Sequence, residues 1–195
     1  KKYYPVDKAY WESMQMDYAI ADLENEALLK KYEELELLLP DNYMVFYNYA
    51  IDIDRYVNSA DSKGKDIAAY KKKIPELFKK AISIKSTIEA NLQMANWHYN
   101  ASFESQDMAS RIKGTKPEEV KRKKELLAAV NENLSNAIPY GEEAVRLLSG
   151  LKEYKFSDKT NYKLALEILA SAYKHTGNAT KAAECEKKKM EVDKL

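Results

Sequence analysis

Few residues of this 195-residue sequence are suited to acid–base or nucleophilic chemistry. There are two histidines, His98 and His175, and a single cysteine, Cys185. Zinc and thiol enzymes draw on short motifs such as HExxH or CxxC, and neither motif is present. An enzyme would have to be a hydrolase or a metal-dependent enzyme assembled from residues distant in sequence, with these three residues and Glu104 as candidates.

Packing gives a simpler interpretation of the same residues. Lysines are the only residues near Cys185 in sequence that could activate it, and a free cysteine in a helix commonly serves as a small packing residue. The stretch Lys63-Gly64-Lys65 connects two predicted helices and lacks the spacing of a phosphate-binding loop. We therefore predict that the protein is not an enzyme and has no catalytic residue, no cofactor and no metal site.

The charge balance and hydropathy exclude two further classes. Lys plus Arg total 32 against 31 Asp plus Glu, with four arginines, so there is no broad basic field for nucleic acid. The lysine-rich runs 71–73 and 121–124 have acids close by, which favours a solvated helical face over a site for anionic surfaces. The longest apolar run, 43–49, is far shorter than the roughly 20 residues needed to cross a bilayer. We predict no nucleic-acid partner and no transmembrane segment.

Composition predicts an all-α fold. Ala, Leu, Lys and Glu, all strong helix formers, account for 90 of the 195 residues. Apolar spacing of three and four residues predicts eight helices, over about 7–22, 25–38, 41–59, 65–84, 86–112, 117–149, 159–176 and 179–193. These helices pair into four hairpins, over about 7–38, 41–84, 86–149 and 159–193, within a single domain that spans 1–195.

Glycine and proline support these boundaries. Four glycines fall between predicted helices, at Gly64, Gly114, Gly150 and Gly177. Thr115 and Glu118 have the spacing of a capping box, so the sixth helix is expected to begin near Pro117. Pro139 predicts a bend inside that helix, and Pro75 predicts that the fourth segment divides into two helices.

A pattern of small and aromatic residues recurs with hairpin spacing. In the last hairpin, four residues fit the pattern W-x2-L-G-x2-Y and a glycine makes the turn: Leu166, Leu169, Ala170, Tyr173 and Gly177. Tyr32 and Pro40 match the aromatic and terminal proline of an earlier copy. The pattern resembles the tetratricopeptide repeat (TPR). The resemblance implies a right-handed superhelical array of about four TPR-like hairpins and a scaffold without catalysis.

The repeat register also implies which residues line a concave groove. They are Tyr47, Asn48, Ile51 and Asp54 in the second hairpin, Gln93, Asn96, Tyr99 and Asn100 in the third, and Glu167, Ser171 and Lys174 in the fourth. Such a mixture of polar and apolar side chains is typical of peptide-recognition surfaces. We predict a non-enzymatic scaffold or adaptor that binds a protein or peptide in this groove. A structural protein that self-associates is the alternative.

Two further expectations concern location and the third hairpin. The segments 90–101 and 136–144, separated by a long insertion, look like a subgroup of exported bacterial TPR proteins. Together with a first residue that is Lys1 rather than methionine, this favours export to the periplasm or cell envelope, while the cytoplasm stays open. Within the insertion, 105–124 has few spaced apolar residues. We predict that it projects beyond the array and opens locally at low free energy.

Overall fold

The computed structural model describes residues 8–195. Over this range the protein contains eight α-helices and no strand, which confirms the all-α prediction. The chain divides into two compact units, the first ending at Ser86 and the second comprising Thr87–Leu195. Each unit contains two of the four predicted hairpins. None of the helices in 8–195 is long and apolar enough to cross a membrane.

The first unit is built around aromatic side chains. It contains α1 (Lys8–Ile20), α2 (Asn25–Leu38), α3 (Tyr43–Val57), the short 3-10 helix η2 (Ala60–Ser62) and α4 (Ala68–Ile84). Tyr32 of α2 stacks on Tyr49 of α3 with ring centroids 5.0 Å apart, and both rings are buried. The Tyr32 hydroxyl donates to Asp52 over 2.9 Å, so the buried ring keeps its polar group satisfied.

Pro75 lies inside α4 without dividing it, so the predicted split of this segment is wrong. A proline in a helix removes one backbone hydrogen bond and costs about 3 kcal/mol or more. The residues around it, Ile74, Leu77, Phe78 and Ala81, are all buried. Burial of this apolar face offsets the local cost, because most helical stability in proteins comes from tertiary packing.

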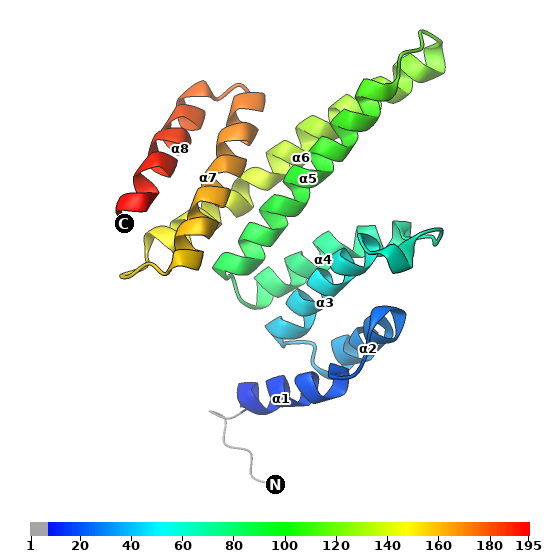
Figure 1. Cartoon of the computed structure of the whole chain (residues 1–195), viewed down its shortest axis with the longest axis vertical. Coiled ribbons are helices and arrows are strands. Elements are labelled where there is room, and N and C mark those ends of the chain that lie inside the picture. The colour runs from blue at the N-terminus through cyan, green and yellow to red at the C-terminus, as the bar shows by residue number, and fades with distance from the viewer. Residues whose placement is uncertain (1–7) are drawn as a thin grey trace. The chain divides into compact units, whose positions relative to one another are not determined.

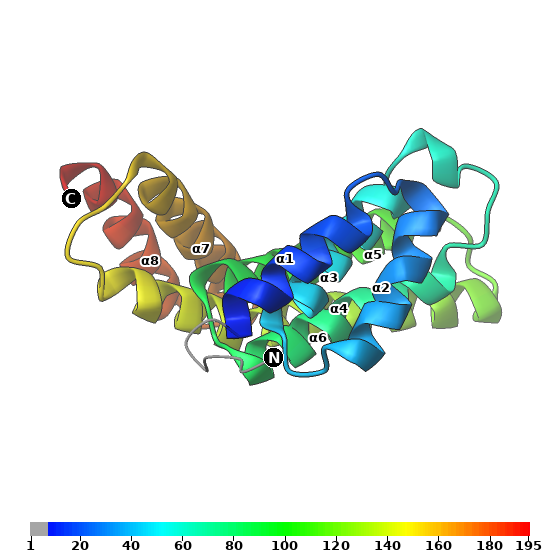
Figure 2. The same cartoon turned by 90° about the horizontal axis from the view of Figure 1, so that it is seen from below.

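The second unit is a stack of two hairpins. It contains α5 (Ile88–Arg111), α6 (Pro117–Ser149), α7 (Phe156–His175), α8 (Ala179–Glu191) and the short 3-10 helix η3 (Val192–Lys194). α5 packs along α6, α7 packs against both, and α8 covers α7 (Figure 1). Figure 2 shows the same side-by-side pairing of α7 and α8 from a second direction.

Close packing between α6 and α7 depends on small residues. Ala137 and Ala144 of α6 are fully buried and share a cluster with Ala165 and Ile168 of α7. A Cβ added at Gly141 would lie 2.9 Å from Leu169 Cδ2, so only glycine fits this contact without a shift. The helices therefore approach each other along a stripe without bulky side chains.

The helix boundaries follow the prediction closely, with two local corrections. α6 does begin at Pro117, but its capping residue is Lys116, whose N–H donates to Glu119 over 3.3 Å. The capping box expected at Thr115 and Glu118 is wrong by one residue, because proline at the first helical position makes the residue before it the cap. α7 begins at Phe156, three residues earlier than expected, because the N–H of Lys155 donates to Asp158 over 2.9 Å.

The α5–α6 hairpin extends beyond the helices that pack on it (Figure 1). At the C-terminal end of α7, His175 Nε2 lies 2.8 Å from Asn131 Oδ1. The fourteen residues of α6 before Asn131 and the end of α5 continue past this contact. Within the second unit, this confirms the prediction that the outer part of the hairpin projects.

Candidate partner-binding surface

The predicted groove residues fall in both units. Of the four in α3, Tyr47 is half-buried, stacks on Tyr43 at 5.5 Å and lies 6.1 Å from Phe78, measured between ring centroids. Asn48 and Ile51 are half-buried, and Asp54 is exposed. A single groove through both units stays a prediction, and the second unit is considered by itself below.

Three side-chain amides form a row on α5. Gln93, Asn96 and Asn100 are spaced by three and four residues, which places them on one side of the helix. Gln93 and Asn96 are half-buried and Asn100 is exposed. Within residues 8–195, none of these three amides hydrogen-bonds to another residue. The row therefore offers free donors and acceptors on a helix that is otherwise well packed.

Two of the four remaining predicted groove residues in the second unit, Tyr99 and Glu167, contact neighbouring helices. Tyr99 packs against a buried cluster of Val130, Leu134 and Ala172, so it helps to hold α5, α6 and α7 together. Glu167 of α7 accepts from Lys189 of α8 over 3.3 Å. Ser171 is half-buried and Lys174 is exposed.

The candidate hydrolase residues have different surroundings in the structure. His98 is buried, and its Nδ1 lies 3.0 Å from Asn133 Oδ1, while His175 contacts Asn131. Burial, followed by the nearby Glu184 carboxylate, raises the pKa of the Cys185 thiol, which disfavours the reactive thiolate. Glu104 is exposed. In the described part of the chain, no three His, Cys, Asp or Glu residues are arranged to hold a metal ion.

A tyrosine–carboxylate–lysine contact, absent from the sequence analysis, clamps the second unit together. The Tyr173 hydroxyl donates to Glu142, and Lys181 Nζ donates to the same carboxylate over 3.0 Å. The Tyr173 hydrogen bond, followed by Lys181, lowers the pKa of Glu142. Burial and then the carboxylate raise the pKa of Tyr173 to about 12. The contact joins α6, α7 and α8. Its three residues are far apart in sequence, so no motif predicts that they meet.

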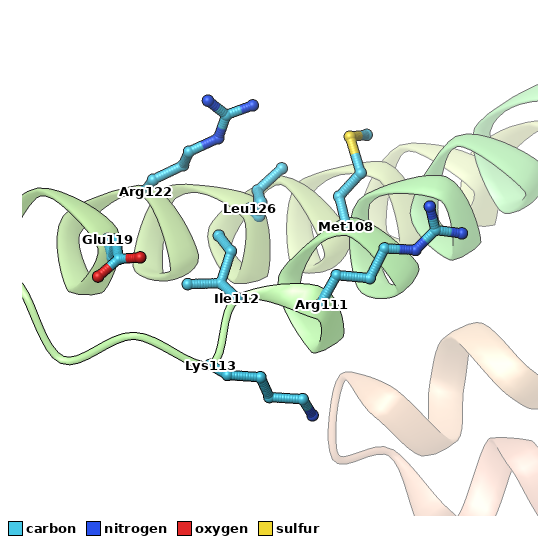
Figure 3. Close-up of a pocket in the computed structure, with 7 residues that line it drawn as sticks. All are labelled: Met108, Arg111, Ile112, Lys113, Glu119, Arg122 and Leu126. Carbon is cyan, nitrogen blue, oxygen red and sulfur yellow. The ribbon is translucent and has the colours of Figure 1, made fainter.

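The tip of the α5–α6 hairpin carries an open pocket of about 380 Å³ (Figure 3). Its apolar side chains are Met108 near the end of α5, Ile112 just after it, and Leu126 on α6. Its charged side chains are Arg111, Lys113, Glu119 and Arg122. Met108 and Ile112 are among the few apolar residues of the insertion 105–124, but only the fold brings Leu126 of α6 opposite them.

One comparison with known proteins gave a match. A family model described as a domain of unknown function (DUF3837) matches residues 73–176. Neither the curated proteins nor the solved structures gave a match. The matched residues include the whole of α5, α6 and α7, and therefore the amide row and the pocket at the tip of the hairpin.

Proposed function

The chain belongs to the DUF3837 family, and we propose that it is a non-enzymatic scaffold that binds an extended peptide segment along α5. The observation that carries this proposal is the row of unpartnered amides at Gln93, Asn96 and Asn100. A side-chain amide has two donor hydrogens and an acceptor oxygen, so it can satisfy both polar groups of a peptide bond.

The spacing of the row suits an extended backbone. A helix rises about 1.5 Å per residue, so the seven steps from Gln93 to Asn100 cover about 10 Å. An extended chain advances about 3.3 Å per residue, and three of its residues cover the same length. Each amide can therefore meet a successive part of a bound segment, as in the recurring modes of peptide recognition.

The repeat resemblance supports the same function. α7 packs on both α5 and α6, which is the neighbour pattern that stacked helical hairpins require. The proposal includes the right-handed superhelical array, with the groove residues of α7 as additional contacts for the bound segment.

The test is a selection from a displayed library of unstructured peptides against the whole chain. Selected peptides are then titrated by fluorescence anisotropy against wild type and Asn96→Ala/Asn100→Ala. Each lost hydrogen bond is worth about 0.5–1.5 kcal/mol, so the double variant should bind about tenfold or more weakly.

Asn136→Ala is the matched control, because Asn136 is an exposed asparagine on α6 that faces no partner within 8–195. This variant should bind like wild type, and circular dichroism should show equal helicity for all three proteins. A selection that yields no binder, or equal loss in Asn136→Ala, would remove the support for the proposal.

A further inference from the structure

We propose a second recognition site on the same hairpin: the pocket at its tip binds an acidic peptide segment that inserts one large apolar side chain. The inference rests on the proposed function in supposing a peptide partner, but it uses a different surface. The site is formed by the end of α5, the loop that follows and the first three turns of α6 (Figure 3).

The pocket has an apolar floor that the rest of residues 8–195 leaves partly open. Met108 is 43 % exposed, and Ile112 and Leu126 are half-buried. Met108 and Ile112 come from the end of α5 and the residue after it, and Leu126 comes from α6, so the floor depends on the hairpin being closed. Large apolar side chains left partly open at one place are typical of surfaces that bind another molecule.

The charge around this floor is positive. Residues 107–125 contain seven Lys and Arg against four Asp and Glu, a net charge of +3 in a chain whose total is +1. Lys121 pairs with Glu125 over 3.9 Å. Arg111 pairs with Asp107 over 2.5 Å. Arg122 and Lys113 have no ion-pair partner within residues 8–195. Two lining cations are therefore available to carboxylates of a bound segment.

The one acid among the lining residues is already engaged. Glu119 accepts from the Lys116 N–H over 3.3 Å. Its carboxylate also covers the backbone at Gly114, where an added Cβ would lie 1.9 Å from Oε2. Glu119 is thus fixed by the loop as a helix cap, and its charge is partly offset by the helix N-terminus. A glycine at position 114 leaves room for the Glu119 carboxylate, which a side chain there would displace.

The shape of the site favours a peptide over a phosphate-bearing surface. Its volume of about 380 Å³ is at the small end of the range for ligand pockets, which suits a single anchoring side chain. Nucleic acid and anionic lipid would bind the exposed Lys121, Lys123 and Lys124 as readily as Arg122, because they recognise charge and make no use of the apolar floor.

The experiment titrates the full chain with a labelled peptide of aspartate and glutamate around one phenylalanine. Two further peptides replace the phenylalanine by alanine or the acids by lysine. Arg122→Glu and Lys123→Glu change the net charge equally, but only Arg122 lines the pocket. We expect Arg122→Glu to weaken binding about tenfold and Lys123→Glu less than threefold, with about tenfold loss on removing the phenylalanine.

Equal losses in the two charge variants, no dependence on the phenylalanine, or no binding by wild type would each overturn the inference. Tighter binding of a DNA duplex or of anionic vesicles, with equal loss in both variants, would assign the tip to a phosphate-bearing partner instead. Asn96→Ala/Asn100→Ala separates the two proposals, because that variant tests the amide row and leaves the pocket unchanged.

Discussion

The two halves of the α5–α6 hairpin are made from the same two helices but are stabilised differently. The inner half, 88–102 with 130–149, packs against α7 through Val130 and Leu134, which are at most 4 % exposed. The outer half, 103–129, buries the small side chains of Ser105 and Ala109 between its own helices. The inner half thus belongs to a core of three helices, whereas within the second unit the two helices of the outer half pack only against each other.

The inner half of the hairpin supports the fold, and the outer half is better suited to binding another molecule. Small buried side chains let two helices approach closely, but they remove little apolar area from water. Phe103, Val120 and Leu127 of the outer half are all exposed, at 39–54 %. A segment with few buried apolar contacts opens at low free energy, and binding regions are commonly drawn from such segments.

The largest expected effect compares two leucines that lie one heptad apart on α6. Leu134 is 4 % exposed and Leu127 is 39 % exposed. Leu134→Ala leaves a cavity against α7 and should lower the free energy of unfolding by about 2–5 kcal/mol. Leu127→Ala should lower it by about 0.5 kcal/mol or less. Urea unfolding of the two variants measures both values, and equal losses would mean that the outer half is packed as well as the inner half.

A smaller effect is expected from filling the contact between α6 and α7. Gly141→Val places two methyl groups where Leu169 already lies within van der Waals distance of a Cβ. Overpacking of this kind costs about 1–3 kcal/mol. Ala128→Val, at an exposed position of the outer half, should cost about 0.5 kcal/mol from helix propensity. If thermal unfolding ranks the two variants in the opposite order, the close approach at Gly141 is not a constraint.

The clamp at Tyr173 gives an effect that depends on pH. Tyr173→Phe removes the hydrogen bond to Glu142 and should cost about 1 kcal/mol at neutral pH. Because the bond lowers the folded-state pKa of Glu142, its contribution is present above the ordinary carboxyl pKa of about 4.3. It is lost as the pH falls through the lowered value. Unfolding measured at neutral and acid pH should therefore show a difference between wild type and variant that shrinks in acid.

The smallest effect on the core should come from removing the outer half itself. Joining Gln106 to Leu126 by a short turn deletes the pocket and the basic segment, but it deletes no residue of the buried clusters in which α5 and α6 contact α7. We expect the near-ultraviolet circular dichroism of the core aromatics to be retained. Loss of that signal would show that the outer half is needed to fold the inner one.

Much of this fold could be predicted from the sequence, for identifiable reasons. The α6 start followed from Pro117, and the α7–α8 turn followed from Gly177, which has φ +83 in the structure. The prediction that Pro75 divides its segment was wrong, because a buried apolar face keeps α4 continuous. The predicted cap of α6 was wrong by one residue.

The candidate sites were less predictable. The positions of Gln93, Asn96 and Asn100 on one side of a helix follow from their spacing, but their lack of partners required the structure. The pocket could be found only in the structure, because Met108 and Leu126 are separated by a turn whose geometry no residue pattern specifies. Tyr173, Glu142 and Lys181 meet for the same reason, across three helices.

Hydrogen exchange on the intact chain tests the division of the hairpin most directly. We predict that the amides of 105–124 exchange faster than those of 126–148, because the outer helix pair can open without disturbing α7. The amides of 162–173, in the buried helix α7, provide the reference for full protection. Protection at 105–124 equal to that at 162–173 would contradict the account, because the outer half would then be part of the packed core.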